Sequence, residues 1–191
     1  MGGDLLERVN VLFARSELNL IRHIILESRQ LPMPPAAVLD LGCGDGRVVE
    51  EFAQHGYDAH GIELNETFVE AAKKRKGIFA YGNYLPSAVI ARTCPGPHVF
   101  LQETPDPYEM LGKRPDQFDL FFIYPFEDQM PPVLDFFRNF AKPGARLLAL
   151  GTEEDWGYNN DPGENIRHIA TPSVFCAGEL MKAYTVYKKI S

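Results

Sequence analysis

The sequence predicts an α/β fold, a doubly wound and mostly parallel sheet with helices on both faces. Short apolar runs alternate with amphipathic segments along most of the chain, which is the pattern of strands and helices in turn. The first apolar run, residues 36–41, enters a turn with glycine at positions 42, 44 and 46. An acid, Glu63, closes the second run at the offset where doubly wound folds bind a ribose.

The chain has 191 residues, the usual size of one domain, so we expect a single domain over residues 1–191. Residues 1–31 should form an N-terminal helical extension, because Asp4 and Glu7 suit a helix start and apolar residues then recur near the helical period. Prolines at 32, 34 and 35 end it. We expect this extension to pack on the sheet or to cover the ligand cleft.

The following elements are assigned from periodicity and from turn residues. Strands are expected at residues 36–41 and 57–62, with helices at 47–54 and 66–76. Later, prolines 131 and 132 begin a helix with Val133, Phe136, Phe137 and Phe140 on one face.

The third strand has two candidates. Residues 77–83 end in Asn83, and residues 98–103 end in Glu103. We favour the first, because the helix at 66–76 already suffices to precede it. Residues 84–116 are then an insertion, rich in proline but too apolar at 88–90 for a free linker. This insertion either faces the substrate or packs without a chemical role, and the sequence favours neither alternative.

The glycine turn indicates a nucleotide-like ligand. Glycine adopts positive φ without penalty and lets a ligand touch the main chain. The spacing is Gly-x-Gly-x-Gly, however, and Arg47 stands where a diphosphate-binding turn needs its last glycine. Asp40 at the strand tip would repel a diphosphate, whereas a sulfonium ligand carrying an amino group would meet a partner.

Residues 38–46 resemble the first motif of the class I, Rossmann-like S-adenosylmethionine-dependent methyltransferases, and residues 61–64 resemble the second. Residues 117–124 resemble the fourth strand of that family, and residues 142–150 the turn and fifth strand. The resemblance covers residues 36 to 151. It implies S-adenosyl-L-methionine as the cofactor and a seven-stranded sheet with an antiparallel last strand. Residues 166–170 and 183–189 can form the closing pair.

The resemblance also implies site residues. The cofactor-binding set is Asp40, Gly42, Cys43, Gly44, Gly46, Glu63, Leu64 and Asn83. The substrate-facing set is Tyr124, Pro125 and Glu127.

The substrate-facing segment departs from the family's pattern for planar amino groups, Asn/Asp-Pro-Pro-Tyr/Phe, because Tyr124 stands first and only one proline follows. Tyr124 either contacts the cofactor or acceptor or simply closes the strand. Glu127 is either a general base or a solvated loop acid. No catalytic residue is assigned, since methyl transfer from a sulfonium requires positioning more than acid–base chemistry.

The amino-acid composition restricts the classes of binding partner that we expect. A net charge of −7 argues against binding to nucleic acid or an anionic membrane, and the basic run at residues 73–76 is explained by a helix end. Three scattered cysteines indicate neither disulfides nor a metal site and favour the cytoplasm. Neither a signal peptide nor a membrane span is visible. The sequence does not indicate an oligomeric state.

We therefore expect methyl transfer to a small molecule or a protein side chain. One alternative is a non-catalytic S-adenosylmethionine-binding or scaffold protein, because the segment at Tyr124 could be specialised or decayed. The other is a nicotinamide-dependent oxidoreductase, which Arg47 disfavours.

Overall fold

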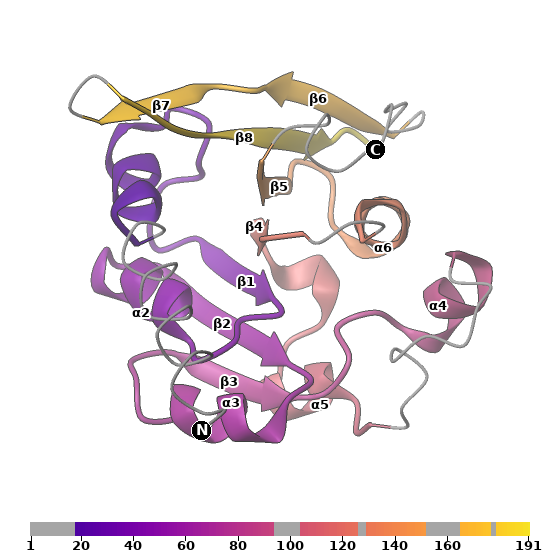
Figure 1. Ribbon diagram of the computed structural model, residues 1–191. Coiled ribbons are helices and arrows are strands. Elements are labelled where there is room, and N and C mark those ends of the chain that lie inside the picture. The colour runs from indigo at the N-terminus through magenta and orange to yellow at the C-terminus, as the bar shows by residue number, and fades with distance from the viewer. Residues whose placement is uncertain (1–17, 94–103, 126–128, 152–164, 177–178) are drawn as a thin grey trace, which may run out of the picture.

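The computed structural model describes residues 18–93, 104–125, 129–151, 165–176 and 179–191, whose strands form a central twisted sheet (Figure 1). The strand order is β3-β2-β1-β4-β5-β8-β6, and a further strand, β7, pairs with β8. The strands are β1 Ala37–Leu41, β2 Asp58–Glu63, β3 Ile78–Tyr81, β4 Leu120–Ile123, β5 Arg146–Leu150, β6 Ile166–Ala170, β7 Ser173–Cys176 and β8 Glu179–Lys189.

Strands β1 to β5 pair in parallel, and β8 runs antiparallel to β5, β6 and β7. The doubly wound sheet with an antiparallel last strand is therefore confirmed. The strand order reverses between β1 and β4. In such sheets a crevice opens at this switch point, outside the carboxyl ends of the strands, and there ligands bind.

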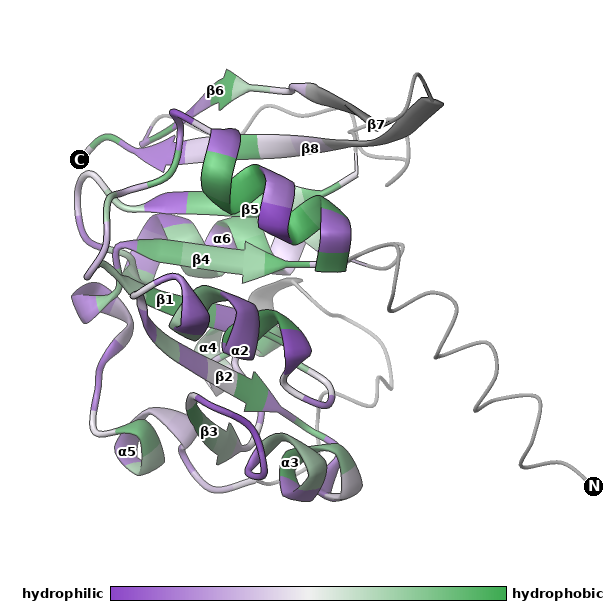
Figure 2. Cartoon of the chain, turned by 90° about the vertical axis from the view of Figure 1, so that its left-hand side faces the viewer, coloured by the Kyte–Doolittle hydropathy of each residue, from purple (hydrophilic) through white to green (hydrophobic). Residues whose placement is uncertain are grey.

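Helices cover both faces of the sheet. Residues 18–27 are helical and lie with α2 and α3 on one face, while α4, α5 and α6 lie on the other (Figure 2). The helices are α2 Arg47–Gln54, α3 Glu66–Ala72, α4 Ser87–Thr93, α5 Pro107–Leu111 and α6 Met130–Phe140, with a 3-10 turn at Pro115–Gln117.

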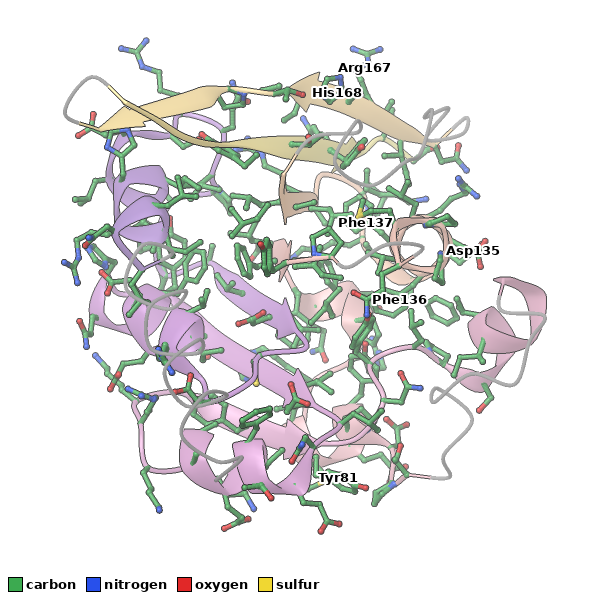
Figure 3. All side chains as sticks on the ribbon, in the orientation of Figure 1. Tyr81, Asp135, Phe136, Phe137, Arg167 and His168 are labelled. Carbon is green, nitrogen blue, oxygen red and sulfur yellow. The ribbon has the colours of Figure 1, made fainter. Side chains whose placement is uncertain are left out.

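Successive side chains of β4 point to opposite faces of the sheet, so this one buried strand contributes to two hydrophobic cores. In β4, Leu120 and Phe122 join the core beneath residues 18–27 and α2, whereas Phe121 joins the core beneath α6. Phe121 packs edge-on against Phe136 and Phe137, with ring centroids 5.9 and 5.5 Å away (Figure 3). The fully apolar β4 is thus buried on both faces, as a central parallel strand must be.

The structure corrects several boundaries. The helix expected at residues 66–76 ends at Ala72, and its last residues form tight turns in which Lys74 and Arg75 donate to Ala71 and Ala72. Strand β8 starts earlier than the 183 expected, and β7 was not expected. The two differences belong together, because β7 and the early part of β8 form an antiparallel pair, with Ser173 opposite Ala183 and Cys176 opposite Glu179.

Residues 78–81 fill the third-strand position beside β2, so the preference for the segment ending near Asn83 is confirmed. The rival segment at 98–103 lies outside the described residues. Within the expected insertion, Val89 and Ile90 are buried in the core that includes α6, so this apolar part packs. Only a short part of the expected N-terminal helix, residues 18–27, is described.

Candidate functional site

The glycine turn lies at the carboxyl end of β1 and leads into α2. The amides of Gly42 and Cys43 both donate to the carbonyl of Ile62 in β2, at 2.9 and 3.0 Å. Gly42, Gly44 and Gly46 have φ values of 81°, 53° and 79°. These conformations favour glycine, which explains the spacing in the sequence.

The first two glycines of the turn present open main chain. A β-carbon built at Gly42 or Gly44 would meet no atom of the described residues within 4 Å. At Gly46, by contrast, it would lie 2.6 Å from a ring carbon of Phe79 and 2.9 Å from the β-carbon of Ala72. Gly42 and Gly44 therefore leave room for a ligand, while Gly46 lets α2 start close to α3 and β3.

Glu63 joins the end of β2 to this turn. Its Oε2 accepts the amide of Gly44 at 2.9 Å, and its Oε1 accepts the amide of Asn65 at 2.8 Å. A carboxylate has about four acceptor positions. Each oxygen therefore keeps capacity for one more donor, such as a ribose hydroxyl.

A pocket of about 450 Å³ opens above the glycine turn. Asp40 lines it and is only 3% exposed, so a carboxylate stands at the floor of the pocket. The walls combine motif residues with residues from α2, α3, β4, β5 and the N-terminal helix. The lining residues are Leu18, Asp40, Gly42, Cys43, Gly44, Asp45, Arg47, Val48, Thr67, Phe68, Ala71, Phe122, Tyr124 and Leu150.

The thiol of Cys43 lies in this pocket but is poorly suited to be a nucleophile. Burial raises its pKa well above the usual value, and the charges of Asp40 and Glu63 act in the same direction. The thiol therefore stays protonated near neutral pH. Cys43 instead fills space, since a β-carbon on Gly61 would lie 2.6 Å from its sulfur.

Among the described residues, five that were predicted for the site do not line this pocket: Gly46, Glu63, Leu64, Asn83 and Pro125. Leu64 follows β2 and is half-buried, and Pro125 is buried directly after Tyr124. Asn83 follows β3; its side-chain oxygen accepts the amide of Leu85 at 3.0 Å, and its own amide donates to Thr104 at 3.1 Å. Glu127 lies outside the described residues.

Ion pairs that sequence reasoning missed brace the same turn. Arg47 and Arg75 both reach Asp45 Oδ2, at 2.6 and 3.2 Å, and Arg75 also pairs with Glu50 at 2.8 Å. Burial lowers the pKa of Arg75, but its hydrogen bond to Glu50 and the charge of Asp45 outweigh burial and raise it. The one signal in the sequence was the basic run at residues 73–76.

Among the described residues, no cluster of three or more histidine, cysteine or carboxylate side chains could hold a metal ion. Within the same ranges, no helix has the length and apolar character required to cross a membrane.

The sequence profile of the methyltransferase domain matches residues 38–81, the segment that holds β1, the glycine turn, α2, β2 and β3. Over 57 residues, the chain is 37% identical to an ATP synthase lysine N-methyltransferase of Caenorhabditis elegans. That match spans 30% of this chain and 30% of the relative.

Solved structures extend the likeness to the whole chain at low identity. The complex of a mutant MtNAS with S-adenosylmethionine superposes with a TM-score of 0.60 at 11% identity, covering 100% of this chain and 68% of the other. A TehB-like S-adenosylmethionine-dependent methyltransferase of Corynebacterium glutamicum gives 0.53 at 17% identity, covering 97% and 96%. A protein of Pyrococcus horikoshii gives 0.60 at 14% identity, covering 92% and 91%.

The chain has the class I methyltransferase fold. At these identities the superpositions show the fold, and the matched segment adds the cofactor motif. In this fold the glycine turn, the acid after β2 and the tip of β4 meet at one edge of the sheet, and Glu63 and Tyr124 occupy these places here. The expectation of a Rossmann-like fold is thereby confirmed, and the match at residues 38–81 supports the resemblance to these methyltransferases.

Proposed function

We propose that this protein is an S-adenosylmethionine-dependent methyltransferase. The observation that carries the proposal is the joint geometry of the turn and Glu63. Open glycine main chain at Gly42 and Gly44 lies beside a carboxylate that bonds Gly44 and keeps acceptor capacity. This arrangement suits a nucleoside whose ribose lies on Glu63 and whose amino-acid part lies near Asp40.

S-adenosylmethionine, when bound, supplies a methyl group on a positively charged sulfur. The residues of the chain have to bind and orient it beside the acceptor and exclude water, because correct alignment can contribute several kcal/mol to the barrier. Asp40 would favour the positive charge of the ligand, and Gly42, Cys43 and Gly44 would shape its main-chain contacts. Leu64 and Asn83 would flank the adenine, while Gly46 would act from beneath the turn.

The acceptor would occupy the apolar part of the pocket. Leu18, Phe68 and Leu150 line it together with Tyr124, which supplies a hydroxyl near the end of β4. We infer a small molecule or a protein side chain as the acceptor. The named activity of the Caenorhabditis elegans relative, lysine methylation, is compatible with this, although the match covers 30% of that protein.

Nucleic acid is a less suitable acceptor, because the net charge of −7 opposes a polyanion. The scattered cysteines support a reducing compartment, for which we propose the cytoplasm. We also propose that residues 1–191 act as one domain, with residues 84–116 as an insertion beside the acceptor region.

Calorimetric titration with S-adenosylhomocysteine and with NAD tests the cofactor. We expect saturable binding of S-adenosylhomocysteine and none of NAD. The reverse result would favour the nicotinamide-dependent oxidoreductase.

A second experiment separates an enzyme from a non-catalytic binding protein. Purified protein and methyl-labelled S-adenosylmethionine are incubated with pools of metabolites and of proteins, and transfer of label is measured. An Asp40→Asn variant, which we expect not to bind the cofactor, is the control. Label that is still transferred in its presence comes from another source. Cofactor binding without transfer to any pool would favour the scaffold alternative.

A further inference from the structure

The basic run at residues 73–76 contains one side chain with a different environment from its neighbours. Lys73 pairs with Glu70 on the exposed face of the chain, with 2.7 Å between Nζ and Oε1. Lys74 and Lys76 are exposed. Of the four side chains, that of Arg75 reaches the start of α2, and it is 34% exposed.

The guanidinium of Arg75 makes three hydrogen bonds there. Nε donates to the main-chain carbonyl of Asp45 at 2.9 Å, and Nη2 donates to the carboxylate of Asp45 at 3.2 Å. Nη1 donates to Oε2 of Glu50 at 2.8 Å. A single planar group therefore joins the last part of the glycine turn to the first turn of α2, as the fork geometry of arginine allows.

The surrounding packing leaves the turn little freedom on this side. Ala72 and Phe79, from the two elements that flank Arg75, occupy the space where a side chain on Gly46 would point. On the other side, Glu63 holds the amide of Gly44. The turn is thus held from β2 by Glu63 and from the connection between α3 and β3 by Arg75.

We propose that Arg75 is a positioning residue that holds the glycine turn, residues 42–46, in its ligand-binding conformation by acting through Asp45. The inference rests on the proposed function, because it takes this turn to be the cofactor site. A turn that is ordered before the ligand arrives does not have to be ordered by binding, and this strengthens affinity. Lysine cannot replace Arg75 fully, since an ammonium group lacks the planar fork that spans Asp45 and Glu50.

Titration with S-adenosylhomocysteine tests the proposal on wild type, Arg75→Ala, Arg75→Lys and the matched control Lys74→Ala. We expect Arg75→Ala to raise Kd about tenfold, the size of effect that loss of charged hydrogen bonds produces. Arg75→Lys should fall between Arg75→Ala and wild type, and Lys74→Ala should equal wild type. Equal Kd for Arg75→Ala and Lys74→Ala would overturn the proposal.

A double-mutant cycle with Asp45→Ala separates positioning from a general loss of stability. If Arg75 acts through Asp45, adding Arg75→Ala to Asp45→Ala should change Kd much less than Arg75→Ala does alone. Additive effects would contradict the proposed route. Thermal unfolding of each variant checks that the protein used is folded.

Amide hydrogen exchange without ligand makes the test independent of the cofactor. The amides of residues 44–46 should exchange faster in Arg75→Ala than in Lys74→Ala, and unchanged exchange would overturn the proposal. A wild-type protein that binds no S-adenosylhomocysteine would refute the proposed function instead. The exchange rates would still decide whether Arg75 holds the turn.

Discussion

We propose that cofactor recognition depends most directly on Glu63. We expect Glu63→Ala to weaken S-adenosylhomocysteine binding by about 1.5–3 kcal/mol, because charged hydrogen bonds to the ligand are lost. The variant also removes the acceptor of the Gly44 amide. Calorimetry on folded protein measures this, with Glu66→Ala as the control, since Glu66 is exposed in the first turn of α3. An unchanged Kd would remove Glu63 from the site.

Gly44 and Gly46 form a matched pair, because both have positive φ but only Gly46 is crowded. Gly44→Ala should lower the free energy of unfolding by about 1 kcal/mol, the cost of this conformation for a residue with a β-carbon. Gly46→Ala adds a clash with Phe79 and Ala72, which should cost about 1–3 kcal/mol more.

Urea unfolding compares the two glycine variants, and calorimetry compares their ligand affinity. We expect Gly44→Ala to impair binding far more than its loss of stability explains, since its new side chain points into open space where the ligand belongs. Equal destabilisation of both variants would contradict the assigned packing of Gly46.

Tyr124 lines the pocket, and we propose that it contacts the acceptor. Tyr124→Ala should lower kcat on an identified acceptor about tenfold or more while changing cofactor Kd little, because misplacement of the acceptor affects the reaction more than cofactor binding. Steady-state kinetics with calorimetry measures both quantities. Tyr81→Ala is the control, since Tyr81 ends β3 and does not line the pocket (Figure 3). Normal turnover would leave Tyr124 as a residue that only closes the strand.

At the scale of elements, the helix at residues 18–27 is docked on α2 by an ion pair. Arg22 donates through Nε and Nη2 to the two carboxylate oxygens of Glu51, at 2.8 and 2.9 Å. The Glu51 side chain is 5% exposed, whereas that of Arg22 is 51% exposed. Leu20, Ile21 and Ile24 bury the apolar face of the helix beside this pair.

Arg22→Ala should lower the free energy of unfolding and, with it, the denaturant midpoint. The effect exceeds that of an ordinary surface pair because a buried carboxylate loses its arginine, yet it stays moderate because Arg22 is half exposed. Denaturant unfolding measures it, with His23→Ala on the exposed side of the same helix as the control. A midpoint equal to that of the control would show that apolar packing alone docks this helix.

For the whole molecule, His60 links folding to pH. Its Nε2 lies 2.8 Å from Oδ1 of Asp58, and its ring packs edge-on against Phe118. Its Nδ1 is buried and has no hydrogen-bond partner among the residues that the structure describes. Burial lowers the pKa of His60, although the charge of Asp58 acts the other way. Burial also acts to raise the pKa of Asp58, but hydrogen bonds from Lys113 and His60 outweigh it and lower that pKa.

Both pKa shifts predict that the folded state loses stability as the pH falls. The unfolded chain takes up the histidine proton near pH 6.5, before the folded chain does, so stability should fall as pH decreases below about 6.5. The contribution of Asp58 is present above about pH 4 and is lost as pH falls further. Urea unfolding between pH 8 and 5 should show this slope, which His60→Phe should reduce and the exposed control His168→Gln should keep. The same slope in His60→Phe would assign it to other groups.

The sequence by itself determined the strand–turn–helix unit, the glycine positions and the acid at Glu63. These features are local, because glycine conformations, strand alternation and the step from β1 to β2 follow from neighbouring residues. For the same reason the third strand could be placed before Asn83. The end of α3 could not be placed, since it depends on contacts with distant parts of the chain. Strand β7 was missed although its partner, the early part of β8, is close to it in the sequence.

Only the tertiary structure decided which other side chains complete the site. Leu18, Phe68 and Leu150 meet at the pocket because parallel strands bring their carboxyl ends to one edge and helices are packed beside them. Arg75 reaches Asp45 because α3 ends early and the chain turns beneath the start of α2. Such a contact leaves no periodic pattern in the sequence, since its two partners are 30 residues apart and only the packing of the folded chain brings them together.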